Sequence, residues 1–226
     1  MTSRTSTTRS TLVYEEVRKE ILRGAFPPGC RLRFVDLAER FTVSQSVVRE
    51  ALMRLAEQGL AVELPQQGFR VRTLNLADLN DITEARIEIE SLVARRAIAH
   101  GDLQWESSVI AAHHTLARTP AMTKTEEVNE DWVDAHEAFH HATLQGCGNG
   151  RLLAIATSLR EAASLYRWWS GSMAPDADRD VALEHRQILD AMVARDEMNA
   201  ACLIAQHIQR TADTLSNLAT QLDVRS

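Results

Sequence analysis

Residues 37–52 read LAERFTVSQSVVREAL, and this stretch predicts two short helices joined by a tight turn. Apolar side chains at helical spacing predict the buried face of a first helix over 35–41. Thr42-Val43 predicts the turn, and Ser44 is a residue type that caps helix N-termini well. We therefore expect a helix-turn-helix. The inward face of its second helix is predicted to carry Val48, Leu52 and Leu55.

The sequence on both sides extends this unit. Upstream, Val13, Val17 and Ile21 recur at i, i+4 and i+8, which predicts a helix that ends near Gly24. Downstream, residues 60–64 and 69–71 alternate in character around a Pro-Gln-Gln-Gly turn, which predicts a β-hairpin. Three helices followed by a hairpin make a winged helix-turn-helix. We place it at residues 11–75, after a Ser/Thr/Arg-rich flexible tail over residues 1–10.

The second helix of the motif has the chemistry of a base-reading helix. A single helix fits the major groove of B-DNA, and its first turn reaches base edges. The alternative is a protein-interaction domain whose arginines are merely solvated. The candidates for contacts with bases are Ser44, Gln45, Ser46 and Arg49. The candidates for contacts with the DNA backbone are Arg33, Arg54, Arg70 and Arg72, together with Gly68 at the hairpin tip.

Beyond Leu76 the sequence predicts amphipathic helices alone, separated by segments that contain Gly or Pro. Helices with short connections imply a helical bundle. The chain is therefore predicted to be mainly α, with an N-terminal winged helix-turn-helix and a C-terminal all-α bundle of about six helices over residues 76–226. The predicted helices are 78–100, 103–118, 125–146, 150–171, 178–194 and 197–222.

The charge divides at the same place. The 226 residues carry a net charge of −6, but residues 1–75 hold 12 Lys and Arg against 8 Asp and Glu, and residues 76–226 hold 13 against 23. A basic part and an acidic part indicate two modules with different partners. We expect no secretory signal and no membrane partner, because apolar runs are short. We expect no disulfide framework, because the sequence contains only three cysteines. This composition predicts a cytoplasmic protein.

Eight histidines lie in the predicted bundle, and spacing singles out four of them. His136 and His140 are four residues apart, about 6 Å along a helix axis and on one face, so both imidazoles can converge on one metal ion. His185 shares a face with apolar residues, and His207 is flanked by isoleucines, so both are expected to point into the bundle. The alternative is that each is an ordinary core or surface histidine.

Three stretches of the first module carry a resemblance: EILRGAFPPG over 20–29, LAERFTVSQSVVREAL over 37–52 and GFRV over 68–71. Residues 11–73 resemble GntR-type transcriptional regulators through them. The family usually has Arg where this chain has Gln45 and often Pro where it has Val47. The resemblance implies binding to double-stranded operator DNA, and these departures put a family-typical operator sequence in doubt. Because one recognition helix contacts few base pairs, we expect a homodimer.

The bundle carries a second resemblance through RIEIE over 86–90, Phe139-His140, EHRQILDA over 184–191 and His207. These residues resemble the all-helical effector domain of FadR-like GntR regulators. In that domain an Asp and three His commonly hold a divalent metal, and a small carboxylate effector often completes the coordination. We accordingly interpret residues 76–226 as an effector-binding and dimerisation domain.

This chain departs from that ligand set, because His136 stands where the family commonly has Asp. Asp134 does not replace it, since two residues turn a helical side chain by about 200°. Either His136 coordinates, which gives an all-nitrogen site suited to Zn or Ni, or the fourth ligand is missing. We expect coordination. The predicted metal ligands are His136, His140, His185 and His207.

An open position on such a metal would let an acidic domain bind an anion. Arg86 is the candidate for a bidentate clamp on a carboxylate, and Arg160 and Arg167 are further candidates. Surface salt bridges are the alternative role of the last two. The sequence therefore predicts a repressor whose operator affinity changes when its bundle binds a metal and a small carboxylate.

Two other functions fit parts of the same sequence. A metal sensor without an organic effector would use the same four histidines. A metalloenzyme would use His136-Glu137-Ala138-Phe139-His140, which matches the H-E-x-x-H pattern of zinc proteases. Glu137, however, lies off the ligand face, and a DNA-binding module would have no role in a protease. We therefore expect no enzymatic activity.

Overall fold

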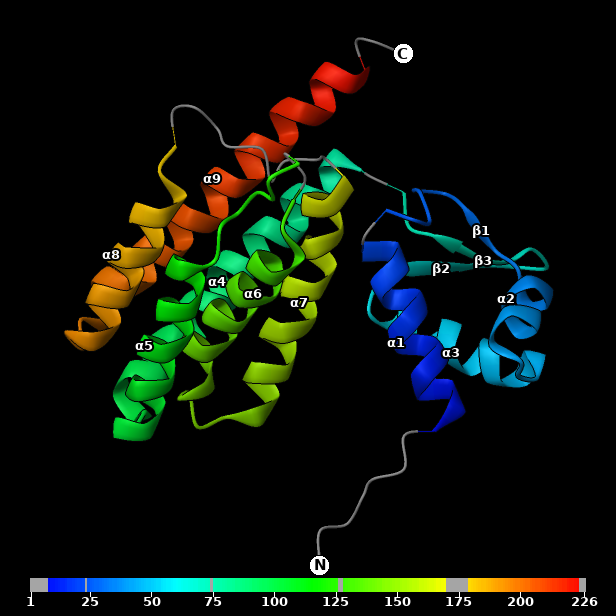
Figure 1. Ribbon diagram of the computed structural model, residues 1–226. Helices are drawn as coiled ribbons and strands as arrows, with labels where there is room; N and C mark the ends of the chain where they lie inside the picture. The colour runs from blue at the N-terminus through cyan, green and yellow to red at the C-terminus, as the bar shows by residue number, and fades with distance from the viewer. Residues whose placement is uncertain (1–7, 23, 74, 126–127, 170–178, 224–226) are drawn as a thin grey trace, which may run out of the picture. The chain divides into compact units, whose positions relative to one another are not determined.

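The computed structural model describes residues 8–22, 24–73, 75–125, 128–169 and 179–223, without the side chains of 165, 167–169 and 218–223 (Figure 1). The described residues form two compact units, the first built mainly by those before Leu76 and the second by most of the rest. The first is a winged helix-turn-helix and the second is all-helical. The predicted fold class is thereby confirmed.

Three helices form the first unit: α1 (Arg9–Leu22), α2 (Phe34–Phe41) and α3 (Gln45–Glu57). Helix α1 begins at Arg9, so the predicted flexible tail over residues 1–10 was wrong for Arg9 and Ser10. A contact distant in sequence orders these residues: Ser10 is buried, and its hydroxyl donates a hydrogen bond to the Glu50 carboxylate at 2.8 Å. Helix α2 ends at Phe41, and the left-handed backbone of the next residue, Thr42 (φ 54°), makes the predicted turn into α3.

The wing is a three-stranded antiparallel sheet in the order β1-β3-β2. Its strands are β1 (Arg31–Leu32), β2 (Ala61–Leu64) and β3 (Gly68–Val71). The hairpin of β2 and β3 is the predicted one, and Leu64 pairs with Gly68 at its turn. Strand β1 was not predicted, because two residues are too few to show an alternating pattern. The core between the sheet and the helices includes Val17, Ile21, Leu32, Leu52, Leu55 and Phe69.

The described part of the second unit contains six helices, as predicted. They are α4 (Leu76–His100), α5 (Leu103–Arg118), α6 (Glu130–Gln145), α7 (Gly150–Trp169), α8 (Val181–Val193) and α9 (Glu197–Asp223). Two begin later than predicted, because better caps lie downstream. The Asn129 side chain accepts a hydrogen bond from the Asp131 amide at the start of α6, and Asp180 accepts one from the Leu183 amide at the start of α8.

The long helices α4 and α9 pack along one another, and α6 and α8 contribute to the same core. Phe139 of α6 and Val93 of α4 are fully buried in it. Among the described residues, no helix combines the length and the apolarity that a bilayer span requires. The core of this unit surrounds the cluster of histidines described below.

Candidate metal centre and nucleic-acid interface

Three helices bring the four predicted histidines to one place. His136 and His140 come from α6, His185 from α8 and His207 from α9. All four side chains are buried, with relative exposures of 8, 4, 2 and 7 % in that order. One nitrogen from each lies within 4.8 Å of the others. Asp134, by contrast, is exposed and stands outside this group.

The distances within the cluster fit a metal ion. The Nε2 atom of His140 lies 3.2 Å from the Nε2 atom of His136 and 3.2 Å from that of His185. A neutral imidazole carries one N–H and one lone pair. Hydrogen bonds alone therefore cannot satisfy all three of these Nε2 atoms, because lone pairs are left facing one another. Nitrogen ligands about 2.0 Å from a tetrahedral Zn stand about 3.3 Å apart. The residues present therefore fit a divalent ion.

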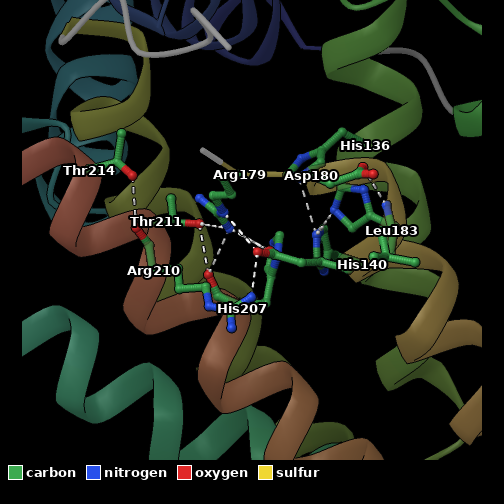
Figure 2. A network of polar contacts seen from close by, with 11 residues as sticks. His136, His140, Arg179, Asp180, Leu183, His207, Arg210, Thr211 and Thr214 are labelled. Carbon is green, nitrogen blue, oxygen red and sulfur yellow. Dashed lines mark hydrogen bonds and ion pairs between the residues drawn. The ribbon is translucent and has the colours of Figure 1, made fainter. Parts of the chain in front are cut away.

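Residues around the cluster fix the orientation of its ligands. His207 Nδ1 lies 2.7 Å from the Glu184 carboxylate, which places the proton on Nδ1 and leaves Nε2 for a metal. Arg179 donates to the same carboxylate at 2.7 Å and to the Thr211 hydroxyl at 3.1 Å. Figure 2 shows this guanidinium directed toward His207 and Thr211. On the other side, the Trp132 ring stacks on His136 with centroids 5.0 Å apart.

Burial keeps three of the four histidines in the protonation state that metal ligands need. It lowers the pKa of His140, and Arg160 and the neighbouring histidines lower it further. Burial also lowers the pKa of His185 and of His207, although Glu184 partly opposes it for His207. Since these imidazoles are neutral at pH 7, each offers a lone pair.

A buried ion-pair network joins α4, α6 and α7. Glu90 of α4 is 2 % exposed and accepts hydrogen bonds from Arg86 Nε at 2.6 Å and from Arg160 Nη1 at 2.9 Å. Arg160 Nη2 donates to Glu137 at 3.1 Å. Burial by itself raises the pKa of Glu90, but the two guanidinium groups outweigh it and hold the pKa below its usual value.

The three candidate effector arginines differ in how many of their hydrogen-bond donors are already used. Both terminal amino groups of Arg160 are occupied by carboxylates. Arg86 uses its Nε, and its two terminal amino groups have no hydrogen-bonding partner among the described residues. The side chain of Arg167 lies outside the described residues. Of the two candidate effector arginines whose side chains the structure describes, Arg86 is therefore the one with donors left for a ligand.

The first turn of α3 exposes the candidate base-reading residues Gln45, Ser46 and Arg49. Ser44 occupies the N-cap position as predicted, but its side chain makes no cap hydrogen bond. Its hydroxyl instead lies 2.8 Å from the Ser46 hydroxyl. Met53, one further turn along α3, is 47 % exposed and extends this face.

The candidates for contacts with the DNA backbone divide into two groups. Arg33 is exposed, and Gly68 takes a positive φ of 78° at the wing turn, which favours glycine. Arg54, in contrast, packs over the Tyr14 ring at 3.9 Å, and Arg70 donates to the Gly29 carbonyl at 3.1 Å. Arg72 donates to the Gly59 carbonyl at 2.6 Å. In this structure the last three hold parts of the first unit together.

Sequence reasoning missed several residues that contact the candidate sites. Glu184 and Glu90 stood in motifs quoted for their neighbours, and their role depends on helices distant in sequence. No sequence pattern pointed to Arg179 or to Glu63, because the fold creates their contacts, that of Arg179 with Glu184 and that of Glu63 with Arg49. His136 and His140 were found because they are four residues apart on one helix, and His185 and His207 through their apolar neighbours and the family resemblance.

Both units of the chain match known protein families. Residues 9–71 match the model of the bacterial regulatory proteins of the gntR family, and residues 81–210 match the FCD domain. The transcriptional repressor GlaR of Escherichia coli K12 is 32 % identical over 198 residues, which cover 86 % of this chain and 90 % of that protein.

Two solved structures share the fold. McbR/YncC of E. coli superposes with a TM-score of 0.77 at 21 % identity, over 95 % of this chain and 99 % of that one. A putative GntR regulator from Rhodococcus sp. RHA1 gives a TM-score of 0.76 at 23 % identity, over 92 and 98 %. This protein is a DNA-binding regulator rather than an enzyme. Since the FCD match covers more than half of the chain, the protein belongs to the GntR family of transcription regulators, in the FadR-like group with an FCD effector domain.

Proposed function

We propose that the second unit of this regulator binds a divalent metal and a small carboxylate, and that this binding changes operator affinity. The observation that carries the proposal is the convergence of four buried imidazoles whose Nε2 atoms lie as close as 3.2 Å. His136, His140, His185 and His207 would hold the ion. An all-nitrogen set suits Zn or Ni. The ion would supply a positive charge that attracts an anion.

Arg86 is the residue proposed to clamp the carboxylate. Its free terminal amino groups support this role, because two parallel N–H donors match the two oxygens of a carboxylate. It lies close enough to the cluster to lower the pKa of His207. Arg160 is assigned instead to holding Glu90, which in turn fixes Arg86.

The first unit is proposed to read one half of an operator. The exposed side chains of Gln45, Ser46 and Arg49 offer the donors and acceptors for base edges, and Arg33 and Gly68 can reach the backbone. One such helix reads few base pairs, so the working form is proposed to be a homodimer on a two-fold operator. Repression is favoured by the likeness to GlaR, a named repressor.

The second candidate is a metal sensor without an organic effector, and the same four histidines support it. The two candidates differ in what changes DNA binding. If the metal alone changes operator affinity and no carboxylate adds to that change, the sensor is the correct function.

The test combines elemental analysis of the purified protein with a thermal-shift screen of small carboxylates. A ligand that binds only the folded state raises the melting temperature. We expect about one Zn or Ni ion per chain and a shift with at least one carboxylate. His140→Ala and His185→Ala should lose the metal and the shift while DNA binding persists. His114→Ala is the control, because His114 is exposed on α5. Unchanged metal content in both cluster variants would refute the assignment.

A further inference from the structure

A carboxylate from the wing holds the guanidinium of Arg49. Arg49 Nη2 donates to Glu63 Oε1 at 3.2 Å, and Glu63 stands on β2 opposite Phe69 of β3. The guanidinium also lies over the Phe34 ring, with 5.9 Å between Cζ and the ring centroid. An arginine of the reading helix is thus positioned by two residues outside that helix.

This pair contributes little to the stability of the fold. The side chains of Arg49 and Glu63 are 59 and 51 % exposed, and ion pairs this exposed are screened by water and salt. An acidic residue beside a DNA-reading face also repels phosphates, which weakens binding to every sequence. Neither the stability of the fold nor general affinity for DNA explains why Glu63 stands beside Arg49.

We propose that Glu63 is a positioning residue that makes Arg49 selective for operator DNA. This inference rests on the proposed role of Arg49 in reading bases. Glu63 holds the guanidinium in one orientation, from which it can donate to O6 and N7 of a guanine. Where the base opposite Arg49 is not a guanine, Arg49 must leave Glu63 to bind a phosphate. Glu63 thereby weakens non-specific binding more than operator binding.

The test measures the selectivity of the full-length protein for DNA. One duplex is selected by the wild-type protein from a random pool, and the second has the same bases in shuffled order. Fluorescence anisotropy gives the affinity for both duplexes across a salt series. The variants are Glu63→Gln, Arg49→Ala and the two combined. Glu57→Gln is the control, because Glu57 is an exposed acid at the other end of α3.

Glu63→Gln is expected to tighten binding to the shuffled duplex about fivefold while binding to the selected duplex changes little. Because Arg49 is then free to neutralise one more phosphate, the slope of log K against log salt on the shuffled duplex should steepen by about one. When Arg49 is already alanine, Glu63→Gln should leave the selectivity unchanged. Glu57→Gln should retain the wild-type selectivity.

Three results would overturn the inference, and they separate it from the proposed reading face. If Arg49→Ala loses selectivity and Glu63→Gln does not, Arg49 reads bases without help from Glu63. If Glu63→Gln has the same effect with and without Arg49, plain repulsion explains it. If Arg49→Ala keeps wild-type selectivity, the proposed reading face fails, and the role of Glu63 fails with it.

Discussion

The two units use the same kinds of polar residues in opposite surroundings. In the first unit, the pair of Arg49 and Glu63 is more than half exposed. In the second, Arg86, Glu90 and Arg160 pair at 7, 2 and 5 % side-chain exposure. An exposed pair exchanges easily with a large partner that stays outside the fold. In a buried pair, each charged group has lost its water and depends on the other group for stabilisation. Such a pair suits a binding site for a ligand small enough to enter the unit.

The histidine cluster extends this contrast. Its imidazoles are buried side by side, an arrangement that is costly unless a ligand or a hydrogen bond satisfies each nitrogen. The proposed reading face has no such demand, since Gln45 and Ser46 are exposed to water. The difference teaches that stability experiments should report on the second unit, and DNA-binding experiments on the first.

The largest expected effect is the loss of the buried carboxylate. Glu90→Gln keeps the side-chain volume but leaves buried Arg86 without its counter-charge and leaves Arg160 with Glu137 alone. Breaking one partner out of a buried ion-pair network costs about 3–5 kcal/mol. Urea denaturation followed by circular dichroism should show this loss in the free energy of unfolding. Glu88→Gln is the control, because Glu88 is exposed on the same helix. A loss equal to that of Glu88→Gln would remove the contrast between the units.

The next effect concerns the carboxylate that orients His207. Glu184→Gln weakens the acceptor for the proton on His207 Nδ1, an atom that lies 2.7 Å from the Glu184 carboxylate oxygen in the wild type. Outer residues of this kind typically contribute about 10- to 100-fold to metal affinity. Competition with a chromophoric chelator for Zn should show a loss of that size. Glu197→Gln, an exposed acid at the start of α9, should bind Zn like the wild type. Equal affinities for all three proteins would exclude a role for Glu184.

A smaller effect follows from the lowered pKa of Glu90. The unfolded chain takes up a proton near the ordinary value of 4.5, whereas the folded chain resists until lower pH. The stability that Glu90 contributes is therefore complete above pH 4.5 and is lost as the pH falls through the folded pKa. The slope is at most about 1.4 kcal/mol per pH unit. The free energies of unfolding of wild type and Glu90→Gln should thus converge in acid, and a constant difference between pH 6 and 3.5 would contradict this origin.

The smallest effect is expected at the exposed pair. Arg49→Ala and Glu63→Gln should each change the free energy of unfolding by less than about 1 kcal/mol, because solvent screens both charges. Leu52→Ala shows that the measurement is sensitive. Its side chain is fully buried in α3, and such truncations cost about 2–5 kcal/mol. A loss near that of Leu52→Ala for either charge variant would mean that the reading face is also structural.

Much of this architecture was predictable because its signals are local. The helix-turn-helix follows from apolar spacing on either side of Thr42, and the hairpin follows from alternation around a Pro-Gln-Gln-Gly turn. Starts of helices were less predictable. Helix α1 extends back to Arg9 because Ser10 meets Glu50, forty positions away. Local propensity contains no information on such a contact.

The candidate metal centre was also predictable only in part. Two of its histidines were linked by helical spacing, and His185 and His207 were added through apolar neighbours and family resemblance. Which arginine keeps free donors was not predictable. Arg86 and Arg160 look alike in sequence, and they differ only because Glu137 and Glu90 both face Arg160 in the fold.

The sequence by itself determined the two kinds of unit, the family and the ligand candidates, since periodicity, caps and motifs are written along the chain. The tertiary structure alone decided that three helices bring four imidazoles within 4.8 Å and that Glu184 holds His207. It also decided that Glu90 pairs with Arg160 as well as with Arg86, and that Glu63 holds Arg49. The physical reason is that these contacts join residues far apart in the chain, and packing rather than local preference brings their side chains together.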